Sequence, residues 1–245
     1  MDRTAPLPDL ASMAAVFDRL RADPPAVHVI TSPVAAERTA NTLLALGIRP
    51  SLTVNPGEVA AFVAATDALL INLGMLDSMR DMAITVATAE AMRLNRPWVL
   101  DPVFAEVSPS RCQRTRDLLA LGPAVLKANG REAALADDAP AGTLRIITGS
   151  QDQLMLGAHR LIVSNGHPLA GRVTAIGCAL GAVIAACLAR CDDPLTAAAA
   201  AVTAYGIAIE QAAARSAGPG SFSTALYDCL AALDGDTILR KGRIA

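Results

Sequence analysis

The sequence has few aromatic side chains, little net charge and no apolar run long enough for a membrane span. Aromatic residues make up 3% of the 245 positions and hydrophobic residues 53%, so we expect a core of Ala, Leu and Val side chains. The formal net charge of -2 excludes a broad basic surface for nucleic acid. The most apolar run, residues 179–189, is too short to cross a bilayer. We therefore expect neither nucleic acid nor membrane as a partner.

Several familiar motifs are also missing. No basic segment followed by an apolar stretch opens the sequence, so we expect no secretory signal and a cytoplasmic location. The pattern GxxxxGK[ST] and the pattern GxGxxG do not occur, which excludes a P-loop and a dinucleotide fingerprint. The cysteines form no Cys-x-x-Cys pair and are expected to be mostly small core residues: Cys112, Cys178, Cys187, Cys191 and Cys229.

Short apolar segments alternate with helical patterns along the chain. Strands are expected at 26–30, 51–54, 67–73, 97–103, 124–129 and 145–149, followed by a hairpin at 153–164 that turns at Gly157. Helices are expected at 37–47, near 58–66 and from about 77 to 94, and the chain after the hairpin is expected to be almost wholly helical to Leu233. This alternation predicts one α/β domain over residues 1–245, with a mostly parallel sheet covered by helices on both faces.

Polar or glycine-bearing segments follow five of these strands. They are Thr31-Ser32, Asn72-Leu73-Gly74, Asp101-Pro102, Lys127-Ala128-Asn129 and Thr148-Gly149. Ligands of open α/β sheets bind beyond the carboxyl ends of the strands. Together these segments predict a binding site at that edge.

The residues of this edge allow two interpretations each. Asp101 could orient a cation or a hydroxyl group, or it could cap a turn. Lys127 could reach a phosphate as a point charge, and Glu132 could hold a magnesium-bound water. Asn129 and Glu132 also have the spacing of a capping box at the start of a helix. The residues alone do not decide between these interpretations.

The stretch VTAIGCALGAV (173–183) places Gly177 and Cys178 at a helix start. The amides of a helix start attract anions and favour a thiolate, so this turn could bind a phosphate and activate Cys178. It could equally be only the beginning of a buried helix. Elsewhere, His28 is expected to be a core histidine and His167 a turn residue.

With these residues in hand, the chain resembles the hydroxyethylthiazole kinase family, which has the ribokinase-like fold. The resemblance rests on VHVITSPVAAERTANTLLALG (27–47), DALLINLGML (67–76), VLDPV (99–103), VLKANGREAALA (125–136), IITG (146–149), VSNGHPLAGRVTAIGCALGAVIAA (163–186) and GPGSF (218–222). It implies phosphorylation of 4-methyl-5-(2-hydroxyethyl)thiazole by ATP and Mg²⁺ in thiamine salvage. It also implies a homotrimer whose thiazole pocket lies between subunits.

The resemblance assigns roles to individual residues. Gly177 and Cys178 match the end of the family's Gly-Thr-Gly-Cys anion hole and are implied to be catalytic. Those implied to bind the nucleotide are Lys127, Asn129 and Thr148, and those implied to organise magnesium are Asp101 and Glu132. Ser32, Leu52 and Ala175 fall where the acceptor alcohol is implied to bind.

The chain departs from the family pattern at the site. Ala175-Ile176 replaces Gly-Thr, Lys127 replaces an arginine, and Phe104-Ala105-Glu106 follows Asp-Pro-Val where a glycine-rich turn is expected. The segment from Asp137 to Leu144 is too short for the helix that the family has before the sixth strand. A second hypothesis is therefore a homologue that binds a ligand or partner and has lost phosphoryl transfer. An unrelated cytosolic α/β enzyme is the third.

Overall fold

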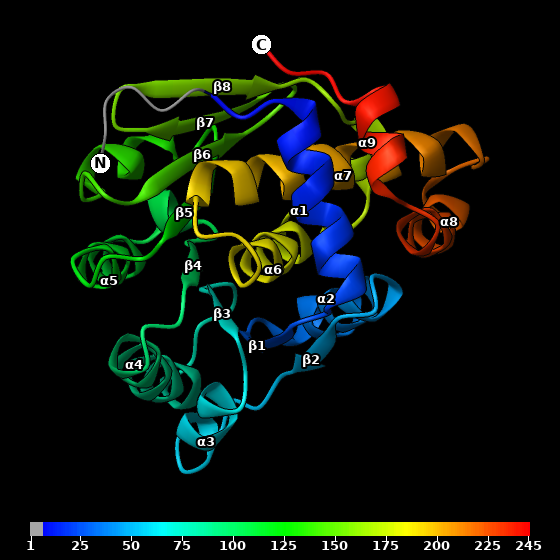
Figure 1. Cartoon of the computed structure of the whole chain (residues 1–245). Coiled ribbons are helices and arrows are strands. Elements are labelled where there is room, and N and C mark those ends of the chain that lie inside the picture. Colours follow the sequence, from blue (N-terminus) through cyan, green and yellow to red (C-terminus); the bar gives the residue numbers. More distant parts are fainter. Residues whose placement is uncertain (1–6) are drawn as a thin grey trace.

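A central sheet organises the chain in the computed structural model, which describes residues 7–245 (Figure 1). Its strands are β1 (Ala26–Ile30), β2 (Arg49–Ser51), β3 (Ala68–Asn72), β4 (Trp98–Asp101), β5 (Val125–Asn129), β6 (Leu144–Thr148), β7 (Asp152–Leu156) and β8 (His159–Val163). Their order across the sheet is β2-β1-β3-β4-β5-β6-β7-β8. The strands from β2 to β6 run parallel, and β7 and β8 are antiparallel to their neighbours.

Helices connect the strands and continue after the sheet. The α-helices are α1 (Leu10–Ala22), α2 (Pro33–Ala45), α3 (Val59–Ala64), α4 (Ser78–Arg93), α5 (Pro109–Leu119), α6 (Ile176–Leu188), α7 (Pro194–Ala214), α8 (Pro219–Ala231) and α9 (Gly235–Lys241). Short 3-10 helices are η1 (Ala105–Val107), η2 (Ala133–Asp138) and η3 (Pro168–Arg172). Together with the sheet they confirm the predicted α/β fold.

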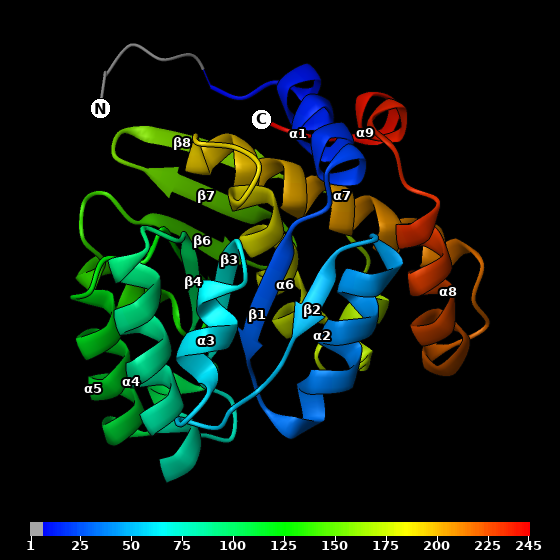
Figure 2. The same ribbon diagram turned by 60° about the horizontal axis from the view of Figure 1, so that its bottom comes forward.

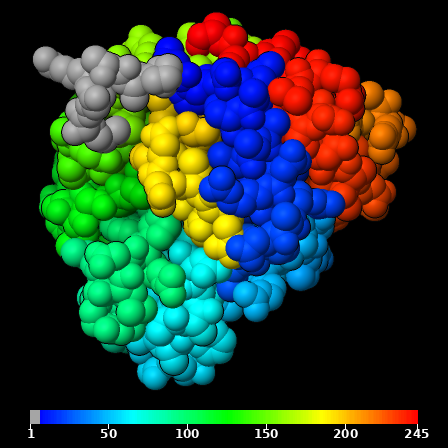
Figure 3. Space-filling view, viewed as in Figure 1, coloured from blue at the N-terminus to red at the C-terminus, as the bar shows by residue number. Residues whose placement is uncertain are grey.

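The helices cover both faces of the sheet, as predicted. Residues of α3, α4 and α5 form a core on one face, and those of α1, α2, α6, α7, α8 and α9 form a larger core on the other (Figure 2). The inner helices α6 and α7 consist largely of alanine, so their backbones can approach the sheet and each other closely. Outside them, α1 and α9 lie side by side on the surface (Figure 3).

Helix α7 is long and apolar enough to cross a membrane by length and composition. In this fold 78% of its apolar window is buried inside the protein. Residues such as Ala200 and Ala204 are fully buried against neighbouring helices and strands. The apolar character of α7 is therefore that of a core helix.

Some element boundaries differ from those predicted. The second strand is Arg49–Ser51 rather than 51–54, because it pairs with β1 at the edge of the sheet before the chain leaves. The first crossover helix begins at Pro33, four residues before the prediction, since proline at the first helical position is preset for a helix. The strand expected at 97–103 ends at Asp101.

Three helices and one strand contact were not predicted. They are α1, the arginine-rich α5, α9, and an isolated antiparallel bridge between Val163 and Ile244. The prediction of an α-helix after Asn129 was wrong, because the 3-10 helix η2 follows there instead. Within the described residues 7–245, no α-helix lies between β5 and β6, in agreement with the short segment noted from the sequence.

His28 is the buried core histidine that the sequence predicts. Its ring contacts the Ser51 hydroxyl through Nδ1 (2.7 Å) and the Thr53 carbonyl through Nε2 (3.1 Å). Burial lowers the pKa of His28 to about 4, although the Thr53 carbonyl opposes this effect. The neutral ring is thus the form that this site accepts.

We expect the stability of the protein to fall as the pH drops. In the unfolded chain the pKa of His28 is about 6.5, above its folded value. Its contribution is therefore complete above pH 6.5 and is lost as the pH falls toward 4, by up to about 1.4 kcal/mol per pH unit. Urea unfolding at pH 7 and pH 5 measures this loss. The His28→Gln variant should lose less stability between these pH values than wild type, whereas the exposed His167→Gln should lose as much.

Candidate active site

The predicted polar segments meet at the carboxyl ends of the parallel strands. In the sheet register Asn72 lies beside Asp101, and Asn129 lies beside Thr148. Asp101, Asn129 and Thr148 border a cavity of about 410 Å³. The residues that line it are Asp101, Val103, Phe104, Lys127, Asn129, Glu132, Thr148, Ala170, Gly171, Val173, Ala175, Ile176, Gly177 and Cys178.

A buried ion pair forms the floor of this cavity. Lys127 Nζ lies 3.2 Å from Asp101 Oδ1, and both side chains are almost fully buried. Asn72 Nδ2 donates to the other carboxylate oxygen of Asp101 at 2.8 Å. Burial disfavours the Lys127 ammonium, but the negative groups around it, led by Asp101, outweigh this and raise the pKa of Lys127. The cavity therefore contains a fixed positive charge.

Cys178 faces the same cavity as a thiol. Burial, assisted by the Asp101 carboxylate, raises the pKa of Cys178 to about 11. The expectation that the helix start favours a thiolate was therefore wrong. The Lys127 ammonium and a hydrogen bond from Asn72 lower the pKa of Cys178, but loss of water and the negative charge at Asp101 outweigh them. At neutral pH Cys178 can donate a proton but cannot act as a base.

Helix α6 begins at the cavity with its first amides available. Its N-cap residue, Ala175, has φ +67°, and among residues 7–245 no side chain caps this helix end. By contrast, Asp77 and Asp193 cap α4 and α7 with their carboxylates. A Cβ placed on Gly177 would be 4.0 Å from Lys127 Nζ, so the ammonium lies beside the first turn. Free amides and a cation together make an anion-binding site.

The bend before α6 forms without a glycine. Ala175 occupies the left-handed region, which costs a residue with a Cβ about 1–2 kcal/mol relative to glycine. We expect Ala175→Gly to raise stability by about 0.5–1 kcal/mol, since part of this relief is lost to the greater freedom of glycine in the unfolded chain. Thermal unfolding measures this gain. The matched control is Ala89→Gly on the exposed face of α4, which should lower stability by about 1 kcal/mol. If both Ala175→Gly and Ala89→Gly lowered the stability, the backbone strain inferred at Ala175 would be contradicted.

The Asn129-Glu132 turn follows the capping interpretation that the sequence allowed. Glu132 Oε2 accepts a bond from the Asn129 amide (3.0 Å), and Asn129 Oδ1 accepts one from the Glu132 amide (3.3 Å). This is the reciprocal pattern of a capping box, formed here ahead of η2. Glu132 Oε1 also accepts the Phe104 amide at 2.7 Å, so the buried carboxylate joins two loops at the cavity.

The loop after β4 also turns without glycine. Val103 and Phe104 have φ values of +26° and +57°. The Phe104 amide bond to Glu132 and a bond from Arg111 Nη1 to the Val103 carbonyl (2.7 Å) hold this conformation. The departure from a glycine-rich turn thus changes the side chains at the cavity and keeps a left-handed bend.

A second cavity of about 280 Å³ adjoins the first and shares five lining residues with it: Thr148, Ala170, Gly171, Ile176 and Gly177. Its other side is formed by apolar residues of α6 and α7, among them Leu180, Val202 and Ile209. Its lining also includes the polar residues Asp152, Asn165 and His167. We call this second space the apolar cavity, after its wall of α6 and α7 side chains, and the first space, which contains the Lys127–Asp101 ion pair, the charged cavity.

The structure brings together most of the residues predicted for the site. The first cavity is bordered by eight of them, namely Asp101, Lys127, Asn129, Glu132, Thr148, Ala175, Gly177 and Cys178. Within the part of the chain that is described, neither cavity lining includes Ser32 or Leu52. Asn72 belongs to one of the predicted strand-end segments, but neither a role for it nor its bond to Asp101 was predicted from the sequence.

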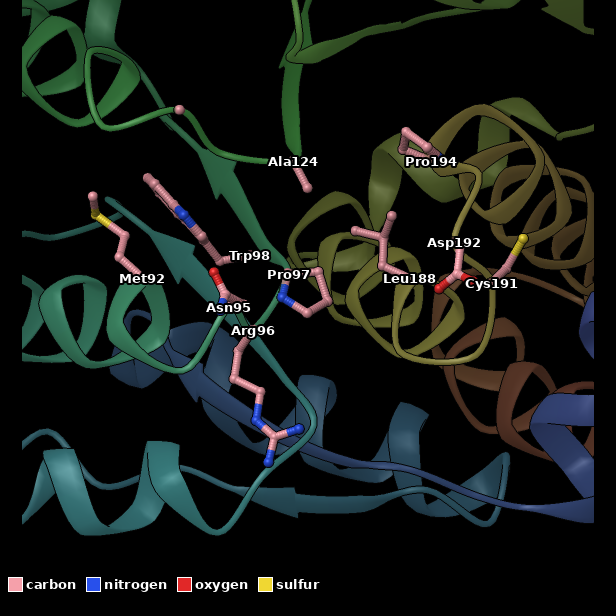
Figure 4. A pocket seen from close by; sticks show the side chains of 11 residues that line it. Met92, Asn95, Arg96, Pro97, Trp98, Ala124, Leu188, Cys191, Asp192 and Pro194 are labelled. Atoms are coloured by element: carbon pink, nitrogen blue, oxygen red, sulfur yellow. The ribbon is translucent and has the colours of Figure 1, made fainter. Parts of the chain in front are cut away.

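A cavity of about 570 Å³ lies at the opposite edge of the sheet (Figure 4). It is bordered by Trp98 at the start of β4 and by Leu188 and Pro194 at the α6–α7 turn. In Figure 4 the Arg96 side chain extends away from these residues. This cavity is separated from the polar edge by the length of the strands and is unrelated to the site.

Comparison with known proteins places this geometry in a family. The model of the hydroxyethylthiazole kinase family matches residues 17–139 and 138–236. A probable hydroxyethylthiazole kinase from Agrobacterium fabrum is 38% identical over 237 residues, covering 97% of this chain and 96% of that protein. A hydroxyethylthiazole kinase from Kineococcus radiotolerans is 39% identical, covering 97% and 96%.

Solved structures agree with this assignment. The structure of a hydroxyethylthiazole kinase protein from Pyrococcus horikoshii superposes with a TM-score of 0.89 and 33% identity, covering 95% of this chain and 98% of that one. A pyridoxal kinase from Staphylococcus aureus in complex with ADP shares the fold at a TM-score of 0.57 and 16% identity, covering 76% and 87%. The chain belongs to the hydroxyethylthiazole kinase family.

Proposed function

We propose that this protein phosphorylates the hydroxyethyl group of 4-methyl-5-(2-hydroxyethyl)thiazole with ATP, a step of thiamine salvage. The observation that carries the proposal is the open start of α6, whose amides face the cavity beside the Lys127 ammonium. Such a site suits the charge on a phosphoryl group in transfer. Family membership and the names of the relatives support the thiazole alcohol as acceptor.

The two adjoining cavities define the orientation in which ATP would bind. The apolar cavity between β6, α6 and α7 suits the adenine, and the charged cavity suits the phosphates. Lys127, Asn129 and Thr148 would then contact the phosphates, as the family resemblance implies. A pyridoxal kinase with the same fold has been solved in complex with ADP, which is consistent with a nucleotide as a ligand of this fold.

The residues present also fit magnesium. Asp101 and Glu132 supply carboxylate oxygens at the charged cavity, and each already accepts bonds from protein donors. Mg²⁺ keeps several waters and binds through few carboxylates together with phosphates, so partly engaged carboxylates suit it. We propose that Asp101 and Glu132 hold Mg²⁺ through its waters. The ion would neutralise charge on the phosphates.

Catalysis in this proposal comes from positioning and electrostatics. The amides of Gly177 and Cys178 and the Lys127 ammonium would stabilise the charge on the transferred phosphoryl group. The transition state of phosphoryl transfer is loose, so the attacking alcohol needs little help from a base. This agrees with a site whose nucleophile-side residue, Cys178, remains a protonated thiol.

We expect the Cys178→Ala variant to have a kcat lowered by about tenfold and a Kd for ATP changed by less than about twofold. The thiol lies at the end of the cavity where the acceptor alcohol would meet the phosphate, so its loss disturbs alignment more than nucleotide binding. Steady-state kinetics and calorimetry measure the two effects. Cys112→Ala, on α5, is the control. An unchanged kcat would make Cys178 a core thiol.

The acceptor pocket is proposed to be completed by a second subunit of a homotrimer. Ser32 and Leu52, implied to contact the thiazole together with Ala175, lie outside the cavity lining of one chain. Exposed apolar side chains also lie near this edge, among them Met75 and Phe104, which are 58% and 54% exposed. Both observations support a shared pocket. Sedimentation equilibrium tests the trimer, and a monomer at assay concentration would exclude it.

The decisive experiment is a direct assay of the purified protein. ATP, Mg²⁺ and the hydroxyethylthiazole should give ADP and the phosphorylated thiazole in equal amounts, and ATP should raise the melting temperature. Absence of both turnover and thermal shift would refute the kinase. Fractionation of cells tests the cytoplasmic location that we propose with it.

A further inference from the structure

The loop between β8 and α6 forms one wall of both cavities. Residues 165–167 and 170–171 of this loop line the apolar cavity, and Ala170, Gly171, Val173 and Ala175 line the charged one. Gly166 has φ +148°, a conformation that side chains rarely adopt, so the chain turns sharply as it enters the wall. The position of this loop therefore sets the width of the apolar cavity.

Glu210 of α7 accepts hydrogen bonds from the first residues of this loop, Asn165 and Gly166. Its Oε1 accepts the Gly166 amide at 2.7 Å, and Asn165 Nδ2 approaches its two oxygens at 3.3 and 3.4 Å. Arg243 binds the same carboxylate with two nitrogens, Nη2 at 2.5 Å and Nη1 at 3.2 Å. A carboxylate with several donors around it is a strong acceptor with a fixed orientation.

The segment 241–245 also forms hydrogen bonds with the start of the loop and with β8. The Arg243 amide donates to Asn165 Oδ1 (2.8 Å), and Asn165 Nδ2 donates to the Lys241 carbonyl (3.0 Å). Arg243 Nη2 also donates to the Ser164 carbonyl (2.8 Å), and the Ser164 amide donates to the Arg243 carbonyl (2.9 Å). Ile162 and Ala245 exchange two further backbone bonds. The segment thus extends the sheet beyond β8.

Asn165 is also pressed against α7. A Cβ on Gly206 would lie 2.7 Å from both the Cβ and the carbonyl oxygen of Asn165, so only glycine allows this contact. The neighbouring residues Tyr205 and Ile209 line the apolar cavity. The loop therefore has α7 on one side and the segment 241–245 on the other, and Asn165 touches both.

We propose that Glu210, Asn165 and Arg243 form a clamp that positions the loop 164–171 against the nucleotide, so that the segment 241–245 helps to set ATP affinity. The inference rests on the proposed function, because it assigns the apolar cavity to ATP. The three are positioning residues: Arg243 and Glu210 act through the loop.

The Arg243–Glu210 ion pair of the clamp has little to contribute to overall stability. The Arg243 side chain is 53% exposed and that of Glu210 is 24% exposed. Ion pairs this accessible to solvent add little to the free energy of unfolding. Removing Arg243 should therefore release the loop without unfolding the protein, which makes its effect on the nucleotide measurable.

The test is the Arg243→Ala variant of the full chain. Its Kd for ATP, from calorimetry, and its KM for ATP should rise by about fivefold or more, while kcat and the KM for the alcohol stay within about twofold. Arg243→Lys keeps the charge without the two-nitrogen contact and should recover part of the affinity. Arg240→Ala is the matched control, because Arg240 pairs with Asp236 in the same region at 65% exposure.

Hydrogen exchange provides a readout without turnover. Amides of 164–171, above all Gly166, should exchange faster in Arg243→Ala than in wild type or Arg240→Ala. The clamp would be refuted if these amides exchanged equally fast in Arg243→Ala and in wild type. It would also be refuted if they exchanged faster in Arg243→Ala but the Kd for ATP of this variant were unchanged. If the wild-type protein bound ATP but formed no phosphorylated thiazole, only the proposed function would be refuted. The clamp could still be tested, because the Kd for ATP could still be measured in wild type and in Arg243→Ala. A wild-type protein that does not bind ATP would overturn both.

Discussion

Lys127→Met should lower the stability of the protein by about 3–5 kcal/mol and kcat/KM of the proposed kinase by at least about 100-fold. The substitution leaves the buried Asp101 carboxylate with only Asn72 as a charge-stabilising partner. Burial already raises the pKa of Asp101 against the opposing effect of Lys127, and the loss of the ammonium would raise it further. The charge that faces the phosphates disappears at the same time. Urea unfolding and steady-state kinetics measure the two losses.

The double variant Lys127→Met/Asp101→Asn separates structure from chemistry. With both charges gone, the buried charge penalty is removed, and stability should recover by more than half. Activity should not recover, because neither the cation nor the carboxylate is restored. An active double variant would show that this ion pair serves the fold alone.

Gly206→Val should destabilise the protein by about 3 kcal/mol or more and weaken ATP binding. A Cβ at this position would overlap the backbone of Asn165, which its hydrogen bonds to Glu210, Lys241 and Arg243 hold in place. The loop must move for the side chain to fit, and the apolar cavity changes with it. Thermal unfolding and calorimetry with ATP measure both effects.

Gly220→Ala is the control for this substitution. Gly220 lies in the first turn of α8, and a Cβ there would meet no atom within 4 Å. Alanine favours a helix over glycine, so we expect stability to be unchanged or slightly higher. If Gly206→Val were as mild as Gly220→Ala, the close approach of Asn165 to α7 would be wrong.

The fold could be predicted wherever strands are buried on both faces. Such strands read as continuous apolar runs, as in AVHVI (26–30) and ALLIN (68–72), and their burial is complete. The edge strand Arg49–Ser51 has no such run, since one side faces solvent. Helix α5 carries charged residues along most of its length and shows its apolar face only at Thr115, Leu118 and Leu119. The edge strand β2 and helix α5 therefore depend on tertiary contacts, which the hydrophobic pattern of the sequence does not reveal.

The site could be predicted to the level of strand ends and no further. The five polar segments follow from the rule that ligands bind at the carboxyl edge of the sheet. The choice of partners among their side chains does not, because it depends on register across strands. Asn72 binds Asp101 because β3 and β4 are in register at these residues. The thiol form of Cys178 follows from burial beside Asp101, which a helix-start argument leaves out.

Among residues 7–245, five residues with side chains have a positive φ: Met75, Asn95, Val103, Phe104 and Ala175. Three of them, Val103, Phe104 and Ala175, border the charged cavity. Each such residue costs on the order of 1 kcal/mol, against a total stability of about 5–15 kcal/mol in proteins generally. A chain with this burden tolerates fewer further destabilising substitutions before it unfolds. Glycine at these positions would widen that tolerance, which makes them the first places to change before the acceptor pocket is altered by directed evolution.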